Sequence, residues 1–119
     1  MTGEWVASTL VFVRDVDAAI GFYVDRLGFT RNMRFEHEGT ALVAGVSRGD
    51  CALLLTCQWP AKVGTAVLYL ALGSETFEAA MAEFDAAGVA TTDEWWGNPL
   101  AVVTDPDGNQ LWFARPGAP

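Results

Sequence analysis

The tryptophan side chains of this sequence are its clearest candidates for chemistry, and that chemistry is the binding of flat or cationic molecules. Five occur in 119 residues, and Trp95 and Trp96 are adjacent. Because successive side chains of a strand point to opposite faces, one of this pair must face away from a core. An indole has a wide flat surface and little rotamer entropy to lose, so it suits stacking on a heteroaromatic ring or holding a cation.

Two pairs of carboxylates have the right chemistry for general acid–base catalysis, Asp93 with Glu94 and Asp105 with Asp107. The second pair belongs to a D-P-D-G turn, and backbone geometry explains its residue types better than catalysis does. Nucleophilic catalysis needs an oriented base beside a Ser, Thr or Cys, and no motif of that kind is present. We therefore assign no catalytic residue from these patterns.

The single histidine, His37, is the first residue to consider as a metal ligand, and it lies between Glu36 and Glu38. Alternation along a strand would send His37 to the face opposite both carboxylates, which predicts a surface histidine and no chelating cluster. Cys51 and Cys57 would lie on the same face of one strand, too far apart to form a disulfide. We expect two reduced, partly buried thiols.

The composition is that of an acidic globular protein. It has 15 Asp and Glu against seven Lys and Arg, and its formal charge of −8 argues against nucleic acid and anionic membranes as partners. The same charge would attract a cationic small molecule. No apolar stretch approaches the roughly 18 residues that a membrane span needs. The first residues lack the pattern of an export signal, so we expect a cytoplasmic protein.

The elements that must position these groups form two similar halves. In each half a strand is followed by a helix and three strands, at a period of about 58 residues. The first half, about residues 5–59, has strands predicted at 8–15, 29–38, 40–47 and 51–59 and a helix at 16–28 that Asp15 caps. The second half, about residues 64–115, has strands predicted at 65–73, 89–96, 99–104 and 109–115 and a helix at 74–88.

Each helix can cover only one face of its sheet, so the other face of each sheet is free for another use. We therefore predict a single α+β domain over residues 1–119. In it, two tandem βαβββ modules form a curved mixed sheet around a cleft, whose walls are the inward positions of the strands.

Two segments of the sequence carry a family pattern. "VRDVDAAIGFYVDRLGF" (13–29) and "VVTDPDGNQLWF" (102–113) resemble the opening and closing signatures of the vicinal oxygen chelate superfamily, which includes glyoxalases, extradiol dioxygenases and bleomycin resistance proteins. The order of strands and helices resembles that of the family over the whole chain. The amino-acid residues themselves match the family pattern in these two segments. It implies the fold predicted above, on which many different activities occur.

In metal-dependent members of this superfamily, the resemblance implies ligands from three strands. Those positions fall on Ser8, Val67 and Trp112, where the family usually has His, His and Glu. A hydroxyl, an isopropyl group and an indole cannot hold a divalent metal tightly, so we expect neither a metal nor another cofactor. Trp112 would instead form the floor of an apolar, aromatic pocket.

Bleomycin resistance proteins are similar to this chain in length, in the sign of the charge and in an aromatic residue of the last strand. The resemblance implies non-catalytic sequestration of an aromatic, cationic small molecule such as a bleomycin-family antibiotic. It also implies a homodimer, and in such proteins the two chains exchange strands. The alternative is a metal-free isomerase or lyase of the superfamily, with Glu94, Asp93 or Tyr69 as proton carrier. The expected ligand-binding residues are Trp112, Trp95, Trp96, Ser8, Leu10, Val67, Tyr69, Met33, Phe35, Glu36 and Glu38.

Overall fold

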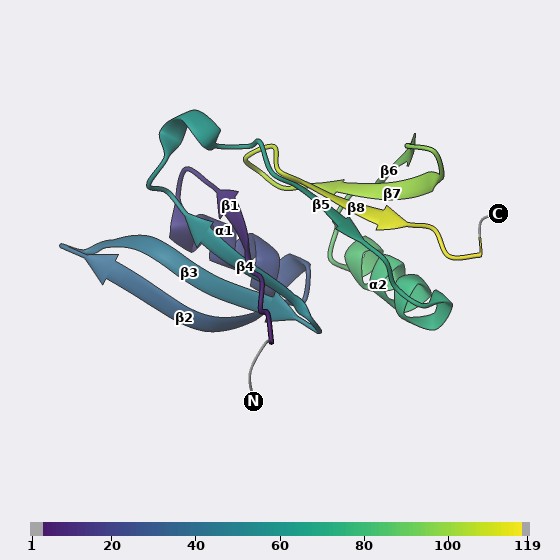
Figure 1. Ribbon diagram of the computed structural model, residues 1–119, viewed down its shortest axis with the longest axis horizontal. Coiled ribbons are helices and arrows are strands. Elements are labelled where there is room, and N and C mark those ends of the chain that lie inside the picture. Colours follow the sequence, from purple (N-terminus) through teal and green to yellow (C-terminus); the bar gives the residue numbers. More distant parts are fainter. Residues whose placement is uncertain (1–3, 118–119) are drawn as a thin grey trace.

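The computed structural model describes residues 4–117, which form two four-stranded sheets, each with a helix packed on one face (Figure 1). In chain order the first module contains β1 (Thr9–Phe12), α1 (Val16–Gly21), the π-helical turn η1 (Phe22–Arg26), β2 (Thr30–His37), β3 (Thr40–Arg48) and β4 (Cys51–Thr56). After a 3-10 turn, η2 (Pro60–Lys62), the second module contains β5 (Val67–Leu70), α2 (Ser74–Ala86), β6 (Thr92–Trp95), β7 (Pro99–Thr104) and β8 (Gln110–Ala114). The predicted α+β class and the repeated order βαβββ are confirmed.

The two sheets have the same topology, with strand orders β1-β4-β3-β2 and β5-β8-β7-β6. In each sheet the first and last strands of the module are parallel, and the other neighbours are antiparallel. The first strand of each module therefore lies at an edge of its sheet. No helix among residues 4–117 is long and apolar enough to cross a membrane.

The first helix begins where the sequence predicts and then departs from the predicted geometry. The side chain of Asp15 accepts a hydrogen bond of 3.0 Å from the backbone N–H of Ala18, which satisfies one donor of the first turn. From Phe22 the helix widens into η1, where the N–H of Leu27 donates to the carbonyl of Phe22 at 3.2 Å. Gly28, with a φ of +76°, ends it.

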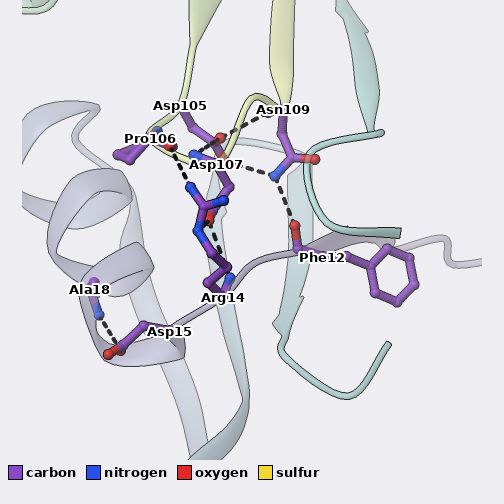
Figure 2. Close-up of polar contacts among 8 residues, drawn as sticks. All are labelled: Phe12, Arg14, Asp15, Ala18, Asp105, Pro106, Asp107 and Asn109. Carbon is purple, nitrogen blue, oxygen red and sulfur yellow. Dashed lines mark hydrogen bonds and ion pairs between the residues drawn. The ribbon is translucent and has the colours of Figure 1, made fainter. Parts of the chain in front are cut away.

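The turn between β7 and β8 connects the two modules (Figure 2). The side-chain amide of Asn109 donates to the carbonyl of Phe12 and to the carboxylate of Asp105, both at 3.0 Å. The hydroxyl of Tyr23, from η1, donates to the same carboxylate at 2.9 Å. Tyr23 and Asn109 are fully buried, and burial raises the pKa of the Tyr23 phenol far above its usual value. The phenol is therefore a fixed donor.

The helix-covered faces of the two sheets share one hydrophobic core. Its members include Val11, Val46 and Leu55 from the first sheet, Leu111 and Phe113 from the second, and Tyr23, Phe77 and Phe84 from the helical segments. In the view of Figure 1, α1 lies behind the first sheet and α2 below the second. The face of each sheet that lacks a helix is therefore a separate surface.

Candidate functional site

The uncovered face of the second sheet carries the pocket with the densest set of aromatic side chains. Strand pairing places Tyr69 beside Trp112, Trp112 beside Val102, and Leu100 beside Glu94. Because partners in neighbouring strands point to the same face, this row lies opposite the core. The pocket has a volume of about 250 Å³ and is lined by Glu94, Trp95, Trp96, Leu100, Val102, Gln110 and Trp112.

Three aromatic rings form one cluster at this pocket. The ring of Trp96 lies 5.5 Å from that of Trp112 and 5.7 Å from that of Tyr69, measured between centroids, with interplanar angles of 64° and 59°. Trp96 is 60% exposed and Tyr69 is 50% exposed, so both rings keep a free surface. Of the adjacent tryptophans, Trp96 is the one that turns onto this face.

Hydrogen bonds hold these rings in place. The indole N–H of Trp112 donates to the side-chain oxygen of Gln110 at 2.9 Å, which uses the only donor of the indole. A tight turn after β6 returns the chain over the sheet. In it the N–H of Trp96 donates to the carbonyl of Asn98 at 3.0 Å, and Gly97 has a φ of +73°. The side-chain amide of Asn98 then donates to the Tyr69 hydroxyl at 3.3 Å.

The two carboxylates of β6 lie on opposite faces and have different surroundings. Asp93 points to the helix side, where its carboxylate pairs with Arg115, and the guanidinium of Arg115 lies 5.6 Å from the Phe77 ring of α2. Glu94 lines the aromatic pocket on the other face. Of these two carboxylates, Glu94 is therefore the one placed to act on a molecule bound at Trp96.

The predicted residues of the first module lie on the uncovered face of the first sheet, outside this pocket. A Cβ at Gly45 would lie 3.1 Å from Cγ of Met33 and 3.8 Å from Cδ2 of Leu54, so both side chains cover that face. Strand pairing puts Leu10 beside Leu54 on it. Leu10, Met33 and Phe35 are 49%, 44% and 53% exposed. Ser8, just before β1, is also exposed.

The structure does not bring Glu36 and Glu38 to the face of Met33 and Phe35. Glu36 accepts a 2.6 Å hydrogen bond from Arg34, whose guanidinium also donates to Asp17 of α1 at 2.8 and 2.9 Å. These hydrogen bonds hold the pKa of Asp17 below its usual value.

Glu38 lies in the turn between β2 and β3 with a φ of +50°, and its carboxylate is 3.3 Å from Nε2 of His37. The predicted alternation of His37 and Glu38 is therefore wrong, because Glu38 has left the strand. His37 is exposed, as the sequence predicts.

A larger cavity, of about 700 Å³, lies between the modules on the side of the helices. It is lined by the start of β1, the β3–β4 turn, β5 and α2, with Arg48 and Asp50 among its polar residues. Cys51 also lines it, and burial raises the pKa of the Cys51 thiol. Cys51 and Cys57 are both free and half-buried.

The positions that would hold a metal in other members of the fold do not fit one here. Val67 and Trp112 lie two residues out of register on neighbouring strands of one face, and Ser8 lies on the other module. They supply one hydroxyl, an isopropyl group and an indole whose N–H is already donated. Within residues 4–117, no three His, Cys, Asp or Glu side chains lie close enough to hold a metal ion together.

Four pocket residues are missing from the predicted binding set, the polar Glu94 and Gln110 and the apolar Leu100 and Val102. The resemblance implies a role for Glu94 only as a proton carrier, but Glu94 is two residues from Trp96, and alternation along a strand indicates that the two share a face. Gln110 is likewise two residues from Trp112. A spacing of two residues from a pocket tryptophan is therefore the sequence signal that could have identified both Glu94 and Gln110.

Comparisons with known proteins agree with this fold. The family model of the Glyoxalase/Bleomycin resistance protein/Dioxygenase superfamily matches residues 5–113. The structure is similar to TnmS3, an antibiotic binding protein from Streptomyces sp. CB03234, with 25% identity, a TM-score of 0.76, and coverage of 98% of this chain and 99% of that chain. It is also similar to the bleomycin-binding protein from bleomycin-producing Streptomyces verticillus, with 24% identity, a TM-score of 0.74, and coverage of 97% and 98%. No curated protein sequence matches this chain.

Proposed function

Since the chain belongs to the Glyoxalase/Bleomycin resistance protein/Dioxygenase superfamily, we propose that it binds and sequesters an aromatic, cationic small molecule such as a bleomycin-family antibiotic, without transforming it. The observation that carries this proposal is the cluster of Tyr69, Trp96 and Trp112 on a sheet face that no helix covers. Similarity to an antibiotic binding protein at 25% identity supports it.

The physical basis is stacking assisted by charge. Each aromatic contact contributes about 0.5–1.5 kcal/mol beyond the burial of its area, and a cation over an indole contributes a similar amount. Tyr69, Trp96 and Trp112 offer such contacts at one place. The formal charge of −8 would raise the association rate of a cation. The pocket is thus suited to hold a flat cation.

Binding to flat cationic antibiotics is the direct test. We expect saturable binding of bleomycin-type compounds, seen as heat in calorimetry and as a change in tryptophan fluorescence. Mass spectrometry of the released compound should show that it is unchanged. The absence of any binding signal across a panel of such antibiotics at high micromolar concentration would contradict the proposal. Chemical conversion of the compound would favour the alternative function, a metal-free isomerase or lyase.

We further propose that a second copy of the chain covers the uncovered faces. Both faces expose large apolar side chains, with Leu10, Met33 and Phe35 on the first sheet and Val67 and Tyr69 on the second. In a two-fold dimer the first sheet of one copy would lie over the second sheet of the other. The predicted ligand-binding residues of the first module and those of the second module would then line one cleft. Because β1 pairs with β4 of its own chain, this dimer needs no exchange of β1.

Phe35→Glu is expected to convert this dimer into a monomer. The change places an unpaired carboxylate on the apolar face, and we expect the dissociation constant of the dimer to rise by about 100-fold or more. Size-exclusion chromatography with light scattering measures the effect. Ala79→Glu adds the same charge on the exposed side of α2 and should leave the dimer intact. A wild-type chain that is monomeric at high concentration would contradict the proposed dimer.

A further inference from the structure

Glu94 is a carboxylate without a cationic partner among residues 4–117. All seven Lys and Arg residues lie within residues 4–117, and none of the salt bridges formed there involves Glu94. Its neighbour Asp93 pairs with Arg115 on the opposite face. The aromatic pocket therefore contains one negative charge that nothing in the described chain neutralises.

The surrounding charge strengthens this feature. Residues 64–117 contain eight Asp and Glu residues and a single basic residue, Arg115, whereas residues 1–63 contain seven acids and six basic residues. Nearly all of the net negative charge thus belongs to the module that carries the pocket. The net negative charge of this module attracts a cationic ligand, and Glu94 is the charged residue among those that line the pocket.

The size of the pocket indicates which part of a ligand it can take. Sites that enclose a drug-sized molecule have volumes of about 300–1,000 Å³. The pocket at Glu94 has a volume of about 250 Å³. It therefore accommodates one end of a larger molecule, and the remainder would lie over the open face at Val67 and Tyr69.

The indole rings and the carboxylate of the pocket together determine which shape of charged group fits at that end of the ligand. Trp96 and Trp112 offer ring surfaces at a centroid distance of 5.5 Å, and Glu94, which has two carboxylate oxygens, lines the same pocket. A planar nitrogen cation can lie against an indole and donate from its edge to a carboxylate at the same time. A tetrahedral ammonium can also lie over an indole, but it cannot stack flat on the ring, and it lacks the planar pair of N–H donors that matches a carboxylate.

We propose that Glu94 selects the charged end of the ligand, and that this end is a planar nitrogen cation of the amidinium type. This inference rests on the proposed function and adds the residue and the charged group to it. Gln110 keeps Trp112 in position by accepting its N–H, and Asp93 has no part in the selection.

A pair of matched probes tests the inference, 2-naphthamidine and the neutral 2-naphthamide, which have the same ring and nearly the same shape. Calorimetry and the indole N–H signals of Trp96 and Trp112 in NMR spectra report binding. We expect the amidine to bind the wild-type protein about 10-fold more tightly than the amide, as for a charge-assisted hydrogen bond. In Glu94→Gln the two probes should bind equally, with the affinity of the amide unchanged. Asp93→Asn should keep the 10-fold preference.

The outcomes separate this inference from the proposed function. Equal affinity of the two probes for the wild-type protein, with shifts of both indole signals, would overturn the role of Glu94 and leave aromatic binding in place. The preference for the amidine could also survive in Glu94→Gln, or be lost in Asp93→Asn as well. Either result would attribute the preference to the overall negative charge of the module and overturn the inference. If neither probe binds or shifts an indole signal, the proposed function and the inference fail together.

Discussion

Asp105→Ala is expected to lower the free energy of unfolding by about 3–5 kcal/mol, the largest effect on stability of any single change that we predict. The carboxylate is almost completely buried and accepts from Tyr23 and from the side chain of Asn109. It also accepts from the backbone N–H groups of Asp107 and Asn109, both at 2.9 Å. Alanine would leave the Tyr23 hydroxyl and the two backbone N–H groups without this acceptor, and the Asn109 amide would keep the carbonyl of Phe12. Chemical denaturation followed by circular dichroism measures the loss.

Asp107→Ala is the matched control in the same turn. Its carboxylate accepts a 3.2 Å hydrogen bond from the backbone N–H of Arg14. It also lies 3.1 Å from Nε of the Arg14 side chain, which is largely exposed. An ion pair with an exposed partner contributes little, so we expect a loss of about 1 kcal/mol. Tyr23→Phe should lose about 1–2 kcal/mol, since one hydrogen bond disappears. Equal losses for Asp105→Ala and Asp107→Ala would show that the turn, and not the buried network, holds the modules.

This network also marks a limit of the sequence analysis. The D-P-D-G motif was correctly interpreted as a turn, with Gly108 at a φ of +103°. Its second role depends on Tyr23, which is 82 residues away in sequence. The helical spacing of the apolar residues between Val16 and Leu27 places Tyr23 on a buried helix face, but it does not indicate that the Tyr23 hydroxyl reaches another module. Long-range polar contacts of this kind leave no periodic signal in the sequence.

Elements with a strong local pattern were predicted closely. The strand predicted at 99–104 has the same bounds as β7, and α2 begins at Ser74 as expected. Elements whose geometry depends on packing were predicted less well. The widening of α1 at Phe22 is one example, and the irregular pairing of β2 after Phe35 is another.

The candidate site could be predicted in part. The resemblance pointed to Trp112, and alternation required one of Trp95 and Trp96 to leave the core side. The choice between them depends on the turn at Gly97, which lies outside any regular element and returns Trp96 over the sheet. The first-module residues could not be placed relative to the pocket, because the sequence does not determine the angle between the modules.

Trp96→Ala is expected to weaken binding of a flat cationic antibiotic by about 30-fold or more. Its ring contacts the rings of both Tyr69 and Trp112, so alanine removes the centre of the cluster. Central aromatic residues of a binding site typically contribute about 2 kcal/mol or more, which corresponds to this loss. Trp96 is 60% exposed, so the variant should fold normally. Calorimetric titration measures the affinity, and thermal unfolding checks the fold.

Trp95→Ala is the matched control, because the adjacent indole belongs to the same strand end and is even more exposed, at 72%. Trp95 touches the rim of the pocket but forms no ring pair with Tyr69 or Trp112 among the described residues. We expect its loss to change the affinity by less than about threefold, since contacts at the edge of an interface contribute little. A larger loss for Trp95→Ala than for Trp96→Ala would place the ligand on the helix side of β6. Binding would then involve the face of Asp93 and Arg115, and the pocket at Trp112 would not be the site.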